Sequence, residues 1–317
     1  MTDDAPRVPR PREPTDVVVL CEVSPAVDRI RRRVPGVAVI DISGGLPDGA
    51  RGEIVYGGRG PASVAAMAGG VRWVQLVGTG IDGLAPEIRA APVLTSARGA
   101  GAVAISEYVI AVMAAFARGF PQNWLRQPPE HWGFQRAQTL AGATLALYGF
   151  GGIGQRIARI ALAMEMEVVA LRRRPGPSTV QGVEMVATLG ELVGSADHLV
   201  LAAPATEATR QAMGTTTLAQ AKPGLHLVNI ARGSLIDQEA LRRALDDGTV
   251  ARASLDVTDP EPLPADHWMY GHPQVYLTPH SSWVGPTMEA SVDYFCDNLV
   301  RYLAGEPLEG VVGDQGY

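Results

Sequence analysis

The stretch Thr144-Leu-Ala-Leu-Tyr-Gly-Phe-Gly-Gly-Ile-Gly154 decides the fold, because an apolar run ends there in a turn of the form G-x-G-x-x-G. A helix-like segment, Gln155–Met164, follows, and this order of strand, turn and helix is typical of a dinucleotide-binding unit. We expect Gly149 to permit the tight turn, Gly151 to let the backbone approach a pyrophosphate, and Gly154 to pack helix against strand, with the phosphates at the helix N-terminus. An ordinary glycine-rich turn is the alternative, since the chain has 36 glycines.

Short apolar runs recur on both sides of this stretch and alternate with helical segments or turns. Helices are predicted over Pro25–Arg33, with Ser24 as N-cap, and from about Ser106 to Phe116. The predicted strands are Val17–Leu20, Val37–Ile40, Glu53–Tyr56, Trp73–Val77, Thr144–Tyr148, Val168–Leu171, His198–Ala202, His226–Ile230, Ala251–Val257 and Val275–Leu277. The last six match the six-stranded dinucleotide fold, and the alternation predicts an α/β protein with parallel sheets covered on both faces.

The composition excludes several classes of protein. The chain has 317 residues, 46% of them apolar and 19% charged, with a formal net charge of −6. This length favours two domains with real cores, and the mildly acidic balance gives no attraction to nucleic acid or anionic membranes. No segment reads as a membrane span. Two cysteines are too few for a disulfide framework or a four-ligand zinc site, which fits a reducing compartment, and we expect no metal. Residues 1–15 contain no apolar region typical of a signal peptide, so we expect a cytoplasmic protein.

Three arginines stand where the cofactor type is decided. The predicted strand Val168–Leu171 runs into Arg172, Arg173 and Arg174. An NAD-specific site usually has a carboxylate at this point for the ribose 2′-hydroxyl, whereas guanidinium groups can bind a 2′-phosphate. We therefore expect NADP(H) to be preferred, with NAD(H) possible. A solvated run of surface charge is the alternative.

Arg232, Glu261 and His280 each stand just beyond a predicted strand. The carboxyl ends of parallel strands line the ligand crevice of an open α/β sheet, so these side chains should converge beside the cofactor. Arginine can hold a carboxylate, histidine can move a proton, and glutamate can orient the histidine. Each residue taken singly is more often structural, but the three occur together downstream of a nucleotide-binding turn.

Taken together, these motifs resemble those of the D-isomer-specific 2-hydroxyacid dehydrogenases, from about Val71 to about Leu303. The resemblance rests on the glycine-rich turn and on Val71-Arg-Trp-Val-Gln-Leu-Val-Gly-Thr-Gly-Ile-Asp82, Asn229-Ile-Ala-Arg-Gly-Ser-Leu-Ile-Asp237, Leu255-Asp-Val-Thr-Asp-Pro-Glu-Pro-Leu-Pro264 and Leu277-Thr-Pro-His280. It implies transfer of a hydride between C4 of a nicotinamide and carbon 2 of a 2-oxo or 2-hydroxy acid. Arg232 would then grip the substrate carboxylate and polarise its carbonyl, His280 would be the general acid/base, and Glu261 its carboxylate partner.

The resemblance also implies roles for further residues. Gly78, Thr79 and Gly80 look like the family's substrate loop, whose backbone amides meet the substrate carboxylate. The residues implied to contact the cofactor are Gly149, Gly151, Gly152, Ile153 and Gly154 at the pyrophosphate and Ile230, Ala231 and Asp256 along the nicotinamide.

Two departures from the common family pattern narrow the expected function. Arg172 replaces the usual Asp, as in the NADP-using branch. Ser281-Ser-Trp283 follows His280 and looks closer to the glyoxylate/hydroxypyruvate reductase group, with Trp283 either walling a small substrate pocket or serving as core. The expected function is reduction of a small 2-oxo acid to the D-2-hydroxy acid. A nucleotide-sensing binding module or corepressor on the same fold is the alternative, and formate oxidation is disfavoured because Glu261 stands where a Gln is expected.

The resemblance implies a Rossmann cofactor domain inserted in a flavodoxin-like substrate domain. We expect a flexible arm over residues 1–15, a substrate domain over 16–102 plus 285–317, a dinucleotide-binding domain over 103–284, and a cleft between the two domains. Relatives pair through the cofactor domain, so we expect a homodimer with the helix from Ser106 and the segment Trp124–Trp132 at its surface.

Overall fold

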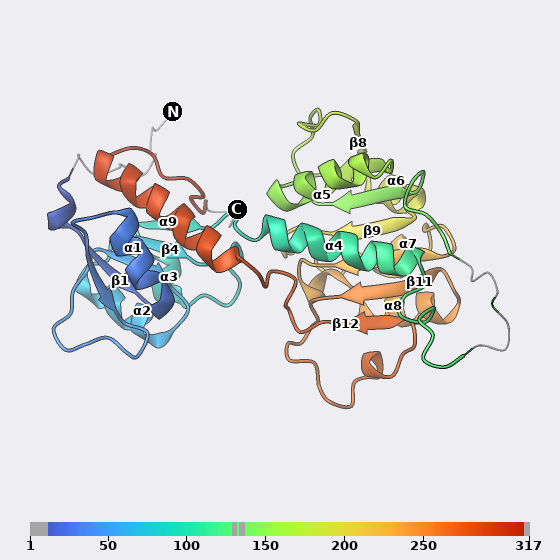
Figure 1. The fold of residues 1–317 in the computed structure, drawn as a ribbon, viewed down its shortest axis with the longest axis horizontal. Coiled ribbons are helices and arrows are strands. Elements are labelled where there is room, and N and C mark those ends of the chain that lie inside the picture. The colour runs from blue at the N-terminus through green and yellow to red at the C-terminus, as the bar shows by residue number, and fades with distance from the viewer. Residues whose placement is uncertain (1–11, 129–131, 133–136, 314–317) are drawn as a thin grey trace. The chain divides into compact units, whose positions relative to one another are not determined.

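The computed structural model describes residues 12–128, 132 and 137–313. The chain divides into two compact units. Unit 1 combines Met1–Gly101 with Gly285–Tyr317, and unit 2 is the continuous stretch Ala102–Val284 (Figure 1).

In its described part, unit 1 contains a five-stranded parallel sheet in the order β2-β1-β3-β4-β5, the order of flavodoxin-like folds. The strands are β1 (Val18–Cys21), β2 (Ala38–Asp41), β3 (Ile54–Gly57), β4 (Trp73–Leu76) and β5 (Val93–Ser96). Sequence reasoning missed β5, whose Val-Leu-Thr-Ser sequence is a weak apolar signal.

Helices cover both faces of this sheet because side chains alternate along its strands. Val19 and Cys21 of β1 face a core shared with α1 (Val27–Arg33) and α9 (Thr287–Ala304), whereas Leu20 faces the core of α2 (Pro61–Ala66) and α3 (Pro86–Arg89). On the first face, Trp73 and Tyr56 stack against aromatic residues of α9.

The described part of unit 2 contains a seven-stranded parallel sheet in the order β12-β11-β10-β9-β6-β7-β8. This is the Rossmann order with one further strand at the β12 edge, and with the flavodoxin-like unit 1 it confirms the expected fold class. The strands are β6 (Thr144–Tyr148), β7 (Glu167–Leu171), β8 (Val183–Met185), β9 (His198–Leu201), β10 (Leu225–Asn229), β11 (Val250–Leu255) and β12 (Val275–Leu277). The sequence predicted six strands and missed β8, which is three residues long.

The helices of unit 2 divide between the two faces of its sheet (Figure 1). One face packs against α4 (Ala102–Ala117) and α5 (Gly152–Ala163); the other packs against α6 (Leu189–Ser195), α7 (Thr215–Leu218) and α8 (Gln238–Asp246). The 3-10 helices of the two units are η1 (Pro14–Asp16), η2 (Ser24–Ala26), η3 (Met67–Gly69), η4 (Gly233–Leu235) and η5 (Trp268–Tyr270). None of the helices that the structure describes is long and apolar enough to span a membrane.

Three local predictions are wrong. Ser24 opens the 3-10 turn η2 and donates its hydroxyl to Asp41, so it is no N-cap of α1. Helix α4 starts at Ala102, about one turn before Ser106. Arg12, in the range expected to be a flexible arm, forms an ion pair with Glu53, and its amide donates to Leu303, so this end of the arm packs on unit 1. Residues 1–11 of the expected arm lie outside the described residues.

Candidate active site

The glycine-rich turn joins β6 to α5. Gly149 has φ +107°, and a Cβ there would lie 2.5 Å from the backbone nitrogen of Ala203. A Cβ on Gly154 would lie 2.5 Å from the carbonyl oxygen of Gly149, so these two glycines serve the turn and the packing. A Cβ on Gly151 or on Gly152 would meet nothing within 4 Å, so the backbone there is open on one side.

Helix α5 begins at this open backbone. Gly151 is its N-cap and supplies no side-chain acceptor for the first-turn amides, those of Gly152 and Ile153 among them. A helix N-terminus of this kind attracts anions through its amides and its dipole. The turn thus fits the pyrophosphate of a dinucleotide.

The three arginines follow the end of β7, as predicted, but they differ in what they do. Arg172 bends back so that its Nη2 donates to the carbonyl of Pro177 at 2.9 Å, and its buried Nε has no partner among the described residues. Arg173 and Arg174 are exposed. No carboxylate occurs from Arg172 to Gly176, so this strand end is cationic.

Arg232 lies in a turn held by the side chain of Asn229, the last residue of β10. Asn229 Nδ2 donates to the carbonyl of Arg232 at 2.8 Å, and Asn229 Oδ1 accepts from the amide of Ala231 at 3.0 Å. The Arg232 Nη1 donates to the carbonyl of Ala231 at 2.6 Å. Ile230 and Ala231 are each 8% exposed and pack into the two cores of unit 2.

Gly233 brings this turn against the loop that carries Glu261. A Cβ at Gly233 would lie 2.0 Å from the carbonyl carbon of Thr258, closer than any side chain allows. Gln238, at the start of α8, also donates to the carbonyl of Asp259. The glycine after Arg232 is therefore a condition for the approach of the two loops.

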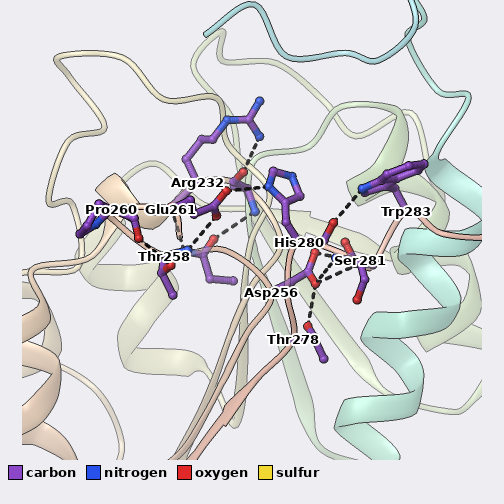
Figure 2. A network of polar contacts seen from close by, with 12 residues as sticks. Arg232, Asp256, Thr258, Pro260, Glu261, Thr278, His280, Ser281 and Trp283 are labelled. Carbon is purple, nitrogen blue, oxygen red and sulfur yellow. Dashed lines mark hydrogen bonds and ion pairs between the residues drawn. The ribbon is translucent and has the colours of Figure 1, made fainter. Parts of the chain in front are cut away.

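The imidazole of His280 is paired with Glu261. His280 Nδ1 lies 2.9 Å from Glu261 Oε2, and the amide of Thr258 donates to the other carboxylate oxygen at 2.9 Å. An ionised carboxylate only accepts hydrogen bonds, so Nδ1 carries the proton and Nε2 is the ring atom left for exchange with a ligand. The two side chains are 43% and 39% exposed. Figure 2 shows Arg232 in the same group.

Asp256 holds the backbone around His280. Its carboxylate accepts from Thr278 Oγ1 at 2.6 Å and from the amides of Ser281 and Ser282 at 2.8 and 3.0 Å, while its carbonyl accepts from the amide of His280 at 2.8 Å (Figure 2). Asp256 is 1% exposed. This positioning function was missed by sequence reasoning, which assigned Asp256 to the cofactor.

Trp283 also contacts the His280 backbone, because its Nε1 donates to the His280 carbonyl at 2.8 Å (Figure 2). It is 42% exposed, so it is not a core residue of unit 2. The predicted substrate loop Gly78–Gly80 belongs to unit 1, where it follows β4, and the carbonyl of Gly78 accepts from the amide of Ala97 at 3.1 Å.

The predicted residues of unit 2 meet at one edge of its sheet. The glycine turn, Arg172, Arg232, Asp256 and His280 follow β6, β7, β10, β11 and β12, which all run parallel. The chain's strand order reverses between β6 and β9, and ligands bind at such a switch point outside the carboxyl ends. Fold and site together define a dinucleotide-binding protein with an Arg–Glu–His group beside the nucleotide turn.

Comparison with known proteins names the family. Residues 110–282 match the model of the D-isomer specific 2-hydroxyacid dehydrogenase, NAD binding domain. The chain belongs to the D-isomer specific 2-hydroxyacid dehydrogenase family, as the resemblance indicated.

The individual relatives are named for different substrates. The chain is 36% identical to D-3-phosphoglycerate dehydrogenase 3, chloroplastic, of Arabidopsis thaliana over 70% of its own length but only 38% of that protein. It is 28% identical to glyoxylate/hydroxypyruvate reductase A of Serratia proteamaculans, over 80% of this chain and 84% of that one. A solved D-isomer specific 2-hydroxyacid dehydrogenase from Xanthobacter autotrophicus Py2, in complex with NADPH and MES, has the same fold, with a TM-score of 0.82, 24% identity and coverage of 95% and 99% of the two chains.

Proposed function

We propose that the protein is an NADP(H)-preferring reductase that converts a small 2-oxo acid, of the glyoxylate or hydroxypyruvate kind, to the D-2-hydroxy acid. The observation that carries this proposal is the His280–Glu261 pair beside Arg232, at the sheet edge that also carries the glycine turn. A binding module without turnover does not need an imidazole that is held through Nδ1 and has Nε2 available for proton transfer.

The reduction would need a hydride from the cofactor, and from the protein a group that binds the acid, a proton donor and a partner for that donor. The cofactor would supply a hydride to carbon 2 of the acid. The Arg232 guanidinium would bind the carboxylate and polarise the ketone, and His280 Nε2 would give its proton to the ketone oxygen as the C=O bond becomes an alcohol. Glu261 would stabilise the imidazolium that precedes this transfer and keep the ring in place. The amides of Gly78–Gly80 would add to the hold on the carboxylate.

The cofactor assignment rests on the charges of the β6–α5 and β7 ends. The amides at Gly152 and Ile153 suit the pyrophosphate, with Gly149, Gly151 and Gly154 shaping the turn. Arg173 and Arg174 are exposed at a strand end without a carboxylate and suit a 2′-phosphate, while Arg172 stiffens their loop. Ile230, Ala231 and Asp256 stay as proposed neighbours of the nicotinamide.

Trp283 would limit the size of the substrate. Its ring is fixed to the His280 backbone, so it would wall the space beside the imidazole and favour a small acid. The reductase relative of Serratia proteamaculans supports the same substrate class. The phosphoglycerate relative makes a phosphorylated 2-oxo acid the competing substrate for the test.

Assembly and location complete the proposal. We expect a homodimer through unit 2, with Trp124 and Trp132, 59% and 88% exposed, at its surface; part of that segment lies outside the described residues. Both cysteines are buried free thiols, which suits the reducing cytoplasm.

The test is a turnover assay that follows nicotinamide absorbance with NADPH and then NADH. The acids are glyoxylate, hydroxypyruvate, phenylpyruvate, a branched 2-oxo acid and phosphohydroxypyruvate. Faster oxidation of NADPH with the two small acids supports the proposal in full. A preference for phosphohydroxypyruvate overturns the substrate assignment, a preference for NADH overturns the cofactor assignment, and NADPH binding without turnover of any acid favours a sensing module.

A further inference from the structure

Two arginines of unit 1 hold the loop that joins β4 to α3. Arg59 donates through Nη1 to the carbonyl of Asp82 at 3.0 Å and through Nη2 to that of Gly80 at 2.6 Å. Arg89 donates to the carbonyl of Ile81 at 2.9 Å. Three successive carbonyls of the loop are thus bound to guanidinium groups of the same unit.

These bonds fix the direction of the loop's amides. In a trans peptide the C=O and the following N–H point in opposite directions, so the amide of Ile81 points away from Arg59. The carbonyl of Gly78 accepts from Ala97, which turns the amide of Thr79 away from β5 in the same manner. Neither of these two amides donates a hydrogen bond to any residue that the structure describes.

The backbone of Arg59, which follows β3, is held by hydrogen bonds to Glu22. Glu22 Oε2 accepts from the amides of Arg59 and Gly60 at 3.1 and 2.9 Å, and Oε1 accepts from the amide of Ser63 at 3.3 Å. A Cβ on Gly60 would lie 2.2 Å from Glu22 Oε1, so glycine is needed for this carboxylate to fit. The guanidinium is therefore carried by a backbone that is tied to β1.

We propose that Arg59 is a positioning residue that holds the loop 78–82 in the conformation that presents the amides of Thr79 and Ile81 to the carboxylate of the 2-oxo acid. Arg59 acts on the carbonyl side of the loop and the substrate on the amide side. This inference rests on the proposed function.

The test compares Arg59→Met with Arg32→Met, which removes an exposed arginine of α1 that makes no contact with this loop. For Arg59→Met we expect KM for the 2-oxo acid to rise about tenfold, because two charge-assisted hydrogen bonds to the loop are lost. We expect kcat and KM for NADPH to stay within about twofold. Arg59→Lys, which keeps the positive charge on a single donor nitrogen, should recover part of the loss.

A second readout does not depend on activity. Endoproteinase Asp-N cuts before aspartate, and cleavage of the Ile81–Asp82 bond in the native protein, measured by mass spectrometry, reports how firmly the loop is held. We expect faster cleavage in Arg59→Met than in the wild type and in Arg32→Met.

Faster cleavage of Arg59→Met than of the wild type and Arg32→Met, together with a raised KM for the 2-oxo acid, supports the proposal. Equal cleavage rates, or an unchanged KM, overturn it; a parallel loss of kcat, cofactor affinity and stability overturns it in favour of a general structural role. If the wild type turns over no 2-oxo acid, the proposed function fails and the substrate part of this inference fails with it, while the cleavage rates still decide whether Arg59 holds the loop.

Discussion

Glu261 touches His280 through one carboxylate oxygen and the backbone amide of Thr258 through the other. The carboxylate is therefore fixed before any ligand arrives, and it fixes the imidazole in turn. The hydrogen bond that the Thr258 amide donates to the carboxylate also restricts rotation of the Glu261 side chain toward solvent. The pair joins two loops: Glu261 lies on the loop after β11, and His280 lies on the loop after β12.

Glu261→Gln is expected to lower kcat by about 10–100-fold while KM for NADPH stays unchanged. The amide oxygen can still accept from Nδ1, but it has no charge to stabilise the imidazolium. Steady-state kinetics across pH would measure the effect. A matched variant, Glu309→Gln, removes an exposed carboxylate paired with Arg301 of α9 and should leave kcat unaltered.

Arg232→Ala is expected to abolish turnover, with a loss of at least about 3 kcal/mol in transition-state binding, because the substrate carboxylate loses its guanidinium. Binding of NADPH, followed by quenching of protein fluorescence, should change little. Arg232→Lys should restore only a small part of the rate, since an ammonium cannot bind a carboxylate in a bidentate manner. Wild-type turnover in Arg232→Ala would remove this residue from the site.

Gly151→Ala and Gly233→Ala separate a ligand effect from a packing effect. A methyl group at Gly151 meets nothing within 4 Å, so the variant should fold with wild-type stability and bind NADPH about tenfold more weakly. A methyl group at Gly233 would collide with Thr258, so that variant should lose about 2–4 kcal/mol of unfolding free energy. Thermal unfolding and a cofactor titration measure both. Unchanged NADPH affinity in Gly151→Ala would argue against a phosphate at this turn.

Replacing Arg173 and Arg174 by Gln is expected to raise KM for NADPH about tenfold or more and to leave KM for NADH nearly unchanged. The reason is that only NADPH has the 2′-phosphate for these exposed groups. Arg172→Gln should instead affect both cofactors, because the Arg172 side chain holds its own loop through Pro177. Equal losses for NADPH and NADH in the double variant would contradict the assignment.

The stability of unit 2 should depend on pH through two buried histidines. His198 and His226 lie with their Nδ1 atoms 3.1 Å apart, and Phe116 of α4 stacks on His226. Burial lowers the pKa of His198 to about 4; burial, His198 and the nearby Arg252 lower the pKa of His226. Asp197, the other charged neighbour, acts in the opposite direction on the pKa of His198.

These pKa shifts determine whether the unfolding free energy rises or falls with pH. Burial favours the neutral form of both rings in the folded protein, whereas in the unfolded chain they gain protons below about pH 6.5. The contribution of His198 is therefore complete above that pH and is lost as the pH falls toward 4, and His226 acts in the same direction. Between pH 7 and 5 we expect His198 alone to remove about 1–2 kcal/mol of unfolding free energy. Denaturant unfolding at several pH values measures this. His198→Gln should reduce the slope in this window and leave the part that is due to His226, and an undiminished slope would exclude His198 as a source.

The sequence predicted most strands and the fold class, and there are physical reasons why it did not predict the short strand β8 and the positioning residues. Strong apolar runs such as Leu145–Tyr148 predicted most strands, whereas β8 is three residues long and is held by β7 rather than by its own pattern. Motifs placed Arg232, Glu261 and His280 at one sheet edge. The positioning groups were missed because their partners are distant along the chain: Asp256 holds Ser281 and Ser282, and Arg59 holds Gly80.

The interrupted course of unit 1 sets an order for biosynthesis. All five of its described strands precede unit 2 in the chain, but α9, which covers Trp73 and Tyr56, follows it. A ribosome therefore releases the whole of unit 2 before it delivers the helix that shields those aromatic rings. Until then, of the described α-helices, only α1 packs on this face of the sheet, so Trp73 and Tyr56 lack their aromatic partners from α9, and truncation at Val284 would make that loss permanent. Unit 2 is one continuous stretch of the chain, so none of its described helices is synthesised after an intervening unit.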